Sequence, residues 1–196
     1  MPRLQPGTAV PPLPFTDVTG TPVPVPRSEG LVHIQFRRFA GCPICNLHLR
    51  SFTVGHSDLQ AAGVAEVVLF HSPAEELRSY ADALPFPLVA DPERTHYQAY
   101  GVERGARALL DPHAWPTIGR AVLRGTGMML RGRERPPAAR PLGGRLGLPA
   151  DFLIGPDGLL RAVHYGTHAA DQWSVAEVLT LAARQQDVTL PTSTTG

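Results

Sequence analysis

The sequence LVHIQFRRFAGCPICNLHLR, residues 31–50, decides the fold that we predict for this chain. Its first six residues, Leu31–Phe36, form a short apolar run rich in β-branched side chains, which is typical of a buried strand. Gly41 breaks the run, and Pro43 stands where a helix would begin. Proline is favoured there because its missing N–H has no partner within the helix. We therefore predict a strand, a short loop and a helix over residues 43–62.

The two cysteines of the chain fall at the start of this predicted helix, Cys42 at its N-cap and Cys45 one turn further on the same side. Unpaired N–H groups and the helix dipole stabilise an anion at that end. A thiol with an ordinary pKa near 8.5 is only about 3% thiolate at pH 7, whereas one with a pKa of roughly 6 is about 90% thiolate. The thiolate is the nucleophile, and a second thiol nearby can displace what the first has captured. We therefore predict a pair that cycles between dithiol and disulfide.

Length and composition restrict the remaining possibilities. A chain of 196 residues is expected to form one domain, residues 1–196, with a substantial core. Its net charge of +1 gives no global electrostatic reason to bind nucleic acid or a membrane. All 18 basic residues are arginine, so lysine Schiff-base chemistry and a P-loop are excluded. Two cysteines are too few for a disulfide-stabilised secreted scaffold, and their C-x-x-C spacing indicates redox chemistry.

The sequence also predicts where the protein is found. Residues 1–12 are rich in proline and lack the charged and apolar regions of a signal peptide. No uninterrupted apolar run approaches the roughly 18 residues that a spanning helix needs. We therefore expect a cytoplasmic protein.

The rest of the chain alternates between strand and helix signals, which favours an α/β layered domain. Residues 15–25 predict an edge hairpin that turns at Thr19-Gly20. The turn signal Pro156-Asp157-Gly158 predicts a second hairpin over residues 148–163. The other expected elements are a strand at Val64–Phe70, a helix from an N-cap at Ser72 to Leu84, a strand at Phe86–Val89, a helix from Asp91 towards Tyr100, and a helix opened by the capping box Ser174-Val175-Ala176-Glu177 and running to about Gln186.

Three segments are less regular. Residues 1–12 are expected to form an extended arm, and residues 187–196 a flexible tail. Residues 103–147 carry nine arginines against three acidic residues and predict a basic insertion with some helical stretches. We interpret this insertion as a solvated surface segment. The alternative is a basic flap or dimer contact beside the redox site.

The order of the predicted elements resembles the thioredoxin fold. A strand, a C-x-x-C helix, a strand and a helix precede a proline, an antiparallel hairpin and a last helix. This resemblance implies an α/β thioredoxin-like fold, with a central mixed sheet flanked by helices. The segment Leu148-Pro149-Ala150 is similar to the cis-proline segment of that fold. It implies that Pro149 faces the cysteines and shapes the groove for the partner disulfide.

A closer resemblance is to the peroxiredoxin-like branch of the alkyl hydroperoxide reductase and thiol-specific antioxidant (AhpC/TSA) superfamily. The residues that carry it are the hairpin over 15–25, the run FRRFAGCPIC and the segment FLIGPDGLLRAVHYG. The similarity covers roughly residues 8–102 and 146–186.

This resemblance implies a thiol peroxidase, or thiol–disulfide oxidoreductase, without cofactor or metal. Cys42 would attack a hydroperoxide or a disulfide, and Cys45 would resolve the product to an intramolecular disulfide. Gly41 and Pro43 would shape the substrate groove. A thioredoxin- or glutathione-type reductant would restore the thiols, and a homodimer is a further expectation.

The sequence departs from the peroxiredoxin pattern Pro-x-x-x-Thr/Ser-x-x-Cys. Gln35 stands at the proline position and Phe39 at the position of the hydroxyl residue. Pro149 stands where peroxiredoxins place an arginine before the late strand. We expect Arg38 to supply a guanidinium group instead, because it is close to the cysteine loop, and Arg37 and Arg145 are the other candidates.

Other functions remain open from the sequence. The chain could be a general thiol–disulfide oxidoreductase without real peroxidase activity, or a redox-sensing or binding module on the same fold. The cysteines together with His164 and His168 have the ligand types of a Cys2His2 zinc site. His33 is expected to be a satisfied core histidine or one that faces a pairing strand. His48 is expected to have a surface or core role, with tuning of Cys45 as the alternative.

Overall fold

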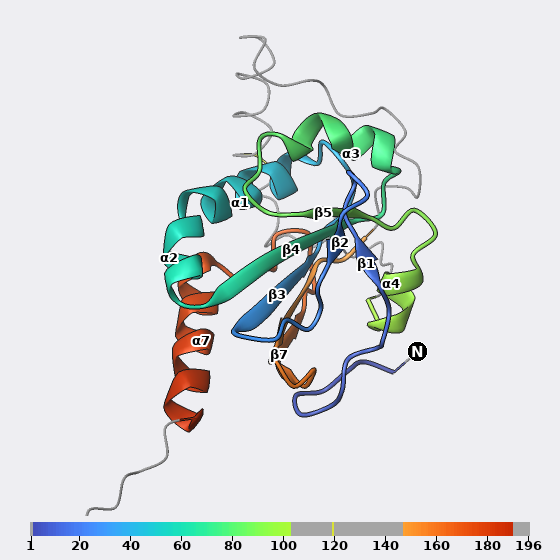
Figure 1. The fold of residues 1–196 in the computed structure, drawn as a ribbon. Coiled ribbons are helices and arrows are strands. Elements are labelled where there is room, and N and C mark those ends of the chain that lie inside the picture. Colours follow the sequence, from blue (N-terminus) through green and yellow to red (C-terminus); the bar gives the residue numbers. More distant parts are fainter. Residues whose placement is uncertain (1, 103–118, 120–146, 190–196) are drawn as a thin grey trace, which may run out of the picture.

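The computed structural model describes residues 2–102, residue 119 and residues 147–189, and its centre is a five-stranded mixed sheet (Figure 1). The strands are β3 (Leu31–Phe36), β4 (Val64–Phe70), β5 (Leu88–Ala90), β6 (Ala150–Ile154) and β7 (Leu160–Tyr165). They lie across the sheet in the order β5-β4-β3-β6-β7. β3, β4 and β5 are parallel, whereas β6 is antiparallel to both β3 and β7. The predicted thioredoxin-like α/β class is therefore confirmed.

The strand β3 is buried on both faces, as its apolar sequence predicts, and all its residues are buried. Side chains alternate between the two faces of a strand, so Val32, Ile34 and Phe36 enter one apolar cluster while Leu31 enters the other. His33 and Gln35 share the face of Leu31. Polar groups are thereby placed in the interior of the sheet, beneath the helices of that face.

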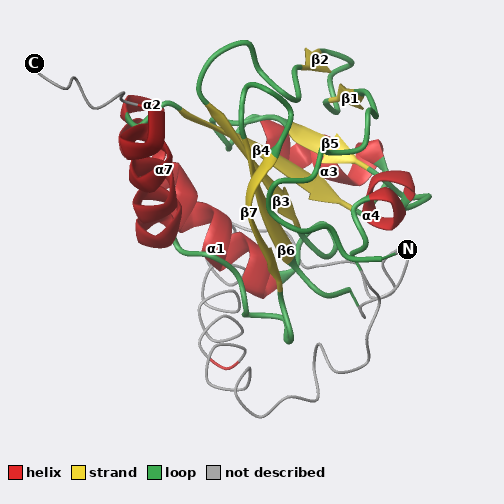
Figure 2. Cartoon of the chain, turned by 90° about the horizontal axis from the view of Figure 1, so that it is seen from below, coloured by secondary structure: helices red, strands yellow, loops and turns green. Residues whose placement is uncertain are grey.

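Helices cover both faces of the sheet (Figures 1 and 2). They are α1 (Pro43–Val54), α2 (His56–Ala61), α3 (Ala74–Ala81), α4 (Thr95–Ala99) and α7 (Val175–Thr189). α1, α2 and α7 pack on the face of Leu31, and α4 lies on the opposite face (Figure 2). Parallel strands need a crossover, which α1 and α2 provide between β3 and β4, and α3 between β4 and β5. Gly55 separates α1 from α2, so the single helix predicted over residues 43–62 is two helices in the structure.

The N-terminal hairpin forms as predicted from β1 (Phe15–Thr16) and β2 (Pro22–Val23), which pair antiparallel. Its turn is closed by one side chain. The carboxylate oxygen Oδ1 of Asp17 accepts the N–H groups of Thr19 and Thr21 at 2.8 and 2.9 Å.

The predicted N-terminal arm is not free of the sheet, because it pairs with the end of β7. The N–H of Gly7 donates to the carbonyl of Leu160 at 2.7 Å, and the N–H of Val10 donates to the carbonyl of Gly158 at 3.0 Å. The arm thus covers part of the exposed edge of the sheet, where unpaired backbone groups would otherwise face solvent.

Most of the predicted basic insertion, residues 103–118 and 120–146, lies outside the described residues, as does the end of the predicted tail, residues 190–196. α7 continues to Thr189, so the chain is helical three residues beyond Gln186. Within the described ranges, no helix combines the length and the apolar character needed to cross a bilayer.

Two helix starts differ from the sequence expectation because capping side chains are used differently. Pro73, not Ser72, is the N-cap of α3. The hydroxyl of Ser72 instead accepts the N–H of Ala40 at 3.0 Å and thereby holds the cysteine loop. α4 begins at Thr95, later than predicted, because the carboxylate of Asp91 lies outside the helix and accepts three N–H groups of its first turn.

The strand β5 also begins later than predicted, at Leu88 rather than Phe86. Pro87 lies between them and has no N–H to donate to the neighbouring strand. Its carbonyl accepts the N–H of Val68 at 3.1 Å, so Pro87 pairs with β4 through its carbonyl alone.

The close approach of Gly30 to Gly63 provides a test of this packing. Gly30 has φ +73°, and a Cβ there would overlap the carbonyl oxygen of Gly63. Gly20 has a similar φ of +92° in the hairpin turn, but a Cβ there meets nothing within 4 Å. We expect Gly20→Ala to lower the free energy of unfolding by about 1 kcal/mol from backbone strain alone, and Gly30→Ala by at least about 2 kcal/mol more. Urea denaturation of the two variants measures the difference, and equal losses would contradict the close packing.

Candidate active site

The loop between β3 and α1 carries both cysteines, and its glycine and proline set its path. Gly41 has φ +74°, a left-handed conformation that glycine adopts without strain. Cys42 is the N-cap of α1, with φ −62° and ψ 118°, and Pro43 is the first helical residue. The N–H of Cys42 donates to the carbonyl of Phe39 at 3.1 Å. The positions predicted for these residues at the start of the helix are therefore those observed.

Both sulfurs are buried, and their surroundings favour opposite protonation states. Cys42 and Cys45 are each 1% exposed, and both are free thiols. A hydrogen bond from the Cys45 thiol, with the charge of Arg38 and the N–H groups at the start of α1, lowers the pKa of Cys42 to about 6 although burial opposes this. The same hydrogen bond and burial raise the pKa of Cys45 well above its ordinary value. The pair therefore contains one thiolate and one thiol that donates to it.

Arg38 lies beside the Cys42 sulfur, where we expected a guanidinium group from the sequence. Its Nη1 is 3.9 Å from the Sγ of Cys42. Its Cζ lies 5.4 Å from the centroid of the Phe39 ring, so the aromatic face supports the guanidinium. The side chain is buried, with 3% exposed. In such a site a positive charge acts on the sulfur with little screening by solvent.

The expectation of a cis-proline at Pro149 is wrong. Among the described residues the cis peptide bond is Val25–Pro26, so Leu148–Pro149 is trans. Pro149 enters the sheet directly ahead of β6, and its carbonyl accepts the N–H of Gly166 at 2.9 Å. The extended trans path suits this pairing, which continues the ladder beyond the partners Ala150 and Tyr165.

Of the other two arginine candidates, the structure describes Arg37, whose guanidinium is bound elsewhere. Arg145 falls outside the described residues. Arg37 is fully buried and turns towards the sheet, where its Nη2 donates to Gln35 and to Asp151, each at 2.7 Å. Gln35 therefore serves this interior group and not the cysteine loop.

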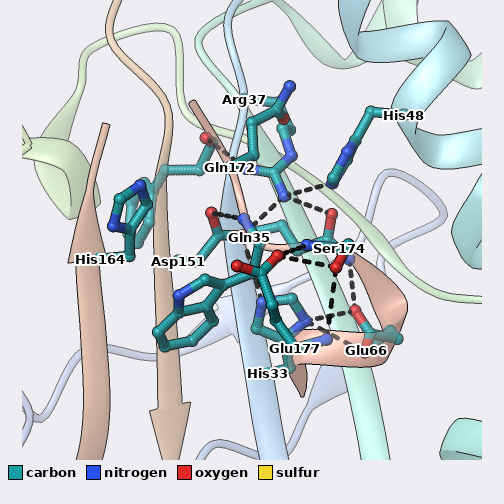
Figure 3. A network of polar contacts seen from close by, with 12 residues as sticks. His33, Gln35, Arg37, His48, Glu66, Asp151, His164, Gln172, Ser174 and Glu177 are labelled. Atoms are coloured by element: carbon teal, nitrogen blue, oxygen red, sulfur yellow. Dashed lines mark hydrogen bonds and ion pairs between the residues drawn. The ribbon is translucent and has the colours of Figure 1, made fainter. Parts of the chain in front are cut away.

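A buried polar network beside α1 is the feature that the sequence analysis missed (Figure 3). It joins β3, β4, β6 and α1 through the side chains of His33, Gln35, Arg37, His48, Glu66 and Asp151. A signal for it was present, because polar residues at positions 33, 35 and 37 alternate along an otherwise apolar strand. Their partners, Glu66 on β4 and Asp151 on β6, are single acidic residues without such an alternation. His33 is nevertheless the satisfied core histidine that was expected.

The ligands of the alternative Cys2His2 zinc site do not form a cluster. Nε2 of His164 lies 2.7 Å from Oδ1 of Asp171, and its ring stacks on Trp173. Nδ1 of His168 accepts the N–H of Ala170 at 3.2 Å. Among the described residues, which include both cysteines, no three histidine, cysteine or acidic side chains form a group that could hold a metal ion.

Solved structures share this fold over nearly the whole chain. Peroxidoxin BcpB from Mycobacterium tuberculosis is 18% identical, with a TM-score of 0.65 over 96% of this chain and 100% of its own. A variant of peroxiredoxin 6 from Arenicola marina is 15% identical, with a TM-score of 0.67 over 97% and 79% of the two chains. AhpC from Mycobacterium bovis is 15% identical, with a TM-score of 0.64 over 100% of both. At these identities the likeness establishes the fold.

A search of curated protein sequences finds no match. A family model described as "AhpC/TSA antioxidant enzyme" matches residues 51–168, which is more than half of the chain and begins after the cysteine pair. The match and the fold agree with the resemblance stated from the sequence. The chain belongs to the AhpC/TSA antioxidant enzyme family and is a thiol-dependent, peroxiredoxin-like redox enzyme.

Proposed function

We propose that this enzyme is a thiol peroxidase in which Cys42 attacks the substrate and Cys45 resolves the product. The observation that supports this most is the environment of Cys42, which lowers its pKa to about 6 at the start of α1. At neutral pH this sulfur is therefore mostly the nucleophilic thiolate. Cys45 keeps its proton and already hydrogen-bonds to the attacking sulfur, so it is placed to form the second bond.

The proposed reaction has two oxidative steps. The Cys42 thiolate attacks one peroxide oxygen, so that an S–O bond forms while the O–O bond breaks, and the leaving oxygen takes a proton to give an alcohol or water. Cys42 is then a sulfenic acid. The Cys45 sulfur attacks it, forming the disulfide and releasing the hydroxyl group with the Cys45 proton as water. Two reducing equivalents from a thioredoxin-type dithiol, or from two glutathione molecules, restore the thiols.

Arg38 supports both the starting thiolate and the first step in this proposal. Its guanidinium is 3.9 Å from the sulfur, and it is therefore close to the oxygen that becomes negative when the O–O bond breaks. A fixed donor aimed at developing charge contributes roughly 10²–10³ in rate. Gly41 and Pro43 shape the loop from which the peroxide approaches, whereas the role expected of Pro149 in a partner groove stays a prediction. The expected homodimer, single domain and cytoplasmic location likewise stay predictions.

A second candidate function is general thiol–disulfide exchange with little peroxidase activity. The apolar and buried Phe39 favours this candidate, because it stands where peroxiredoxins carry a hydroxyl group that positions the peroxide. The two candidates share Cys42 and Cys45 and differ in the oxidant that Cys42 attacks.

The roles of the two cysteines are tested by stopped-flow mixing of reduced protein with hydrogen peroxide, an alkyl hydroperoxide and a small disulfide. We expect Cys42→Ser to abolish turnover, since the attacking sulfur is lost. Cys45→Ser should still react once and then accumulate Cys42 sulfenic acid, which a dimedone adduct reveals by mass spectrometry. Turnover by the Cys42→Ser variant would contradict the mechanism. Reaction of the wild type with the disulfide but with neither peroxide would replace it by the second candidate.

The electrostatic role of Arg38 is tested by the pH dependence of alkylation at Cys42. We expect Arg38→Met to raise the pKa of Cys42 by roughly one unit, because the nearby positive charge no longer favours the thiolate. The alkylation rate at pH 6 should then fall severalfold. Arg50→Met removes the same charge near the end of α1, far along the helix from the sulfur, and should leave the profile unchanged. Identical profiles for the two variants would contradict a specific action of Arg38.

A further inference from the structure

Five buried side chains form a closed ring of polar contacts next to α1 (Figure 3). The members are each at most 2% exposed and are His33, Gln35, Arg37, Glu66 and Asp151. Nδ1 of His33 lies 2.9 Å from Glu66, which accepts from Gln35, and Gln35 in turn accepts from Arg37 at 2.7 Å. Arg37 donates to Asp151 at 2.7 Å, and Asp151 lies 3.2 Å from Nε2 of His33.

The ring balances its own charge. Burial alone would lower the pKa of His33, but Glu66 and Asp151 raise it to about 9, so the imidazole is a cation at neutral pH. Arg37 is the second cation, and the carboxylates of Glu66 and Asp151 are the two anions. Arg37 and His33 hold the pKa of Asp151 below its ordinary range despite burial. Buried ionic groups are tolerated when each has a partner of opposite charge, as in this ring. An additional charge beside them would have no such partner and would be unfavourable.

The ring contacts α1 through a polar contact with His48 and through the imidazole of His33, which lies 5.6 Å from the ring of Phe52. Nη2 of Arg37 lies 3.0 Å from Nε2 of His48. Since arginine can only donate, Nε2 accepts, and the imidazole is neutral with its proton on Nδ1. Burial, and then the charge of Arg37, lower the pKa of His48 well below its ordinary value, with a smaller opposing effect of Asp151 and a further lowering by His33. The neutral form is therefore the stable one.

We propose that His48 is a positioning residue for the redox reaction, because its bond to Arg37 fixes α1 against the sheet. His48 lies three residues after Cys45, and its ring packs on Phe52 at 4.8 Å in the next turn. The groups that lower the pKa of Cys42 include the Cys45 thiol and the N–H groups of the first turn of α1. Their distances to the sulfur depend on the position of α1. The ring of five polar side chains, which is built on β3, β4 and β6, fixes that position through His48. This role rests on the proposed attack by Cys42.

A matched pair of amide variants tests the role of the acceptor. His48→Gln places a carbonyl oxygen near the position of Nε2, whereas His48→Asn carries the same group on a shorter side chain that does not reach Arg37. We expect His48→Asn to raise the pKa of Cys42 by roughly one unit in the pH profile of iodoacetamide labelling. His48→Gln should stay close to the wild type. In both variants Arg37 keeps its bonds to Gln35 and Asp151, so we expect the fold to survive.

Gly20→Ala is the control for a general loss of stability, because Gly20 lies in the hairpin turn between β1 and β2 and not at α1 or the ring. It should lower the free energy of unfolding and leave the pKa of Cys42 in place. Equal profiles for His48→Asn and His48→Gln would overturn the proposal, as would a pKa shift in Gly20→Ala as large as that in His48→Asn. The labelling requires no peroxide, so its outcome is separate from the proposed function. That function fails if wild-type Cys42 labels as a thiolate but reacts with no peroxide.

Discussion

A sulfur that is almost completely buried stays ionised only where the protein replaces the water that would have stabilised its charge. At Cys42 the replacement is a hydrogen bond from Cys45, the guanidinium of Arg38 and N–H groups at the start of α1. Each comes from the ten residues around the sulfur, and each is effective only over a few ångströms. The rest of the structure can be understood as what holds this short segment in place.

The adjacent residues Arg37 and Arg38 contact different parts of the structure. Arg38 lies at the sulfur and carries the charge that the thiolate needs. Arg37 is committed to the buried ring with Gln35 and Asp151, and its own charge is compensated there. The backbone between them is held from the other face of the sheet, because the hydroxyl of Tyr97 on α4 contacts the carbonyl oxygens of Arg37 and Leu69. Two adjacent arginines at the end of a strand thus contact different groups, Arg37 the buried ring and Arg38 the Cys42 sulfur.

Local signals in the sequence predicted a large part of this arrangement. The apolar run of β3, the proline at the first position of α1 and the capping box of α7 each act over a few residues, and the structure has them where they were expected. The position of Cys42 at a helix N-terminus followed from its neighbours Gly41 and Pro43. Arg38 was a good candidate because it is separated from Cys42 by only four positions.

Features that depend on long-range register were not predictable in this way. The ring needs Glu66 opposite His33 on β4, and Asp151 opposite Gln35 on β6, and these pairings are set only when the sheet assembles. Ser72 carried a clear capping signal, but its hydroxyl is used by Ala40, which is distant in sequence. The cis bond expected at Pro149 came from resemblance, and the backbone pairing of this chain does not use it.

We infer that the two buried cysteines differ in charge at neutral pH, and an NMR titration of the reduced protein with labelled cysteine Cβ carbons measures this difference. We predict that the Cβ signal of Cys42 changes with a midpoint near pH 6. The signal of Cys45 should keep its thiol position throughout the neutral range. Two curves that both rise only above the ordinary thiol pKa of about 8.5 would contradict it.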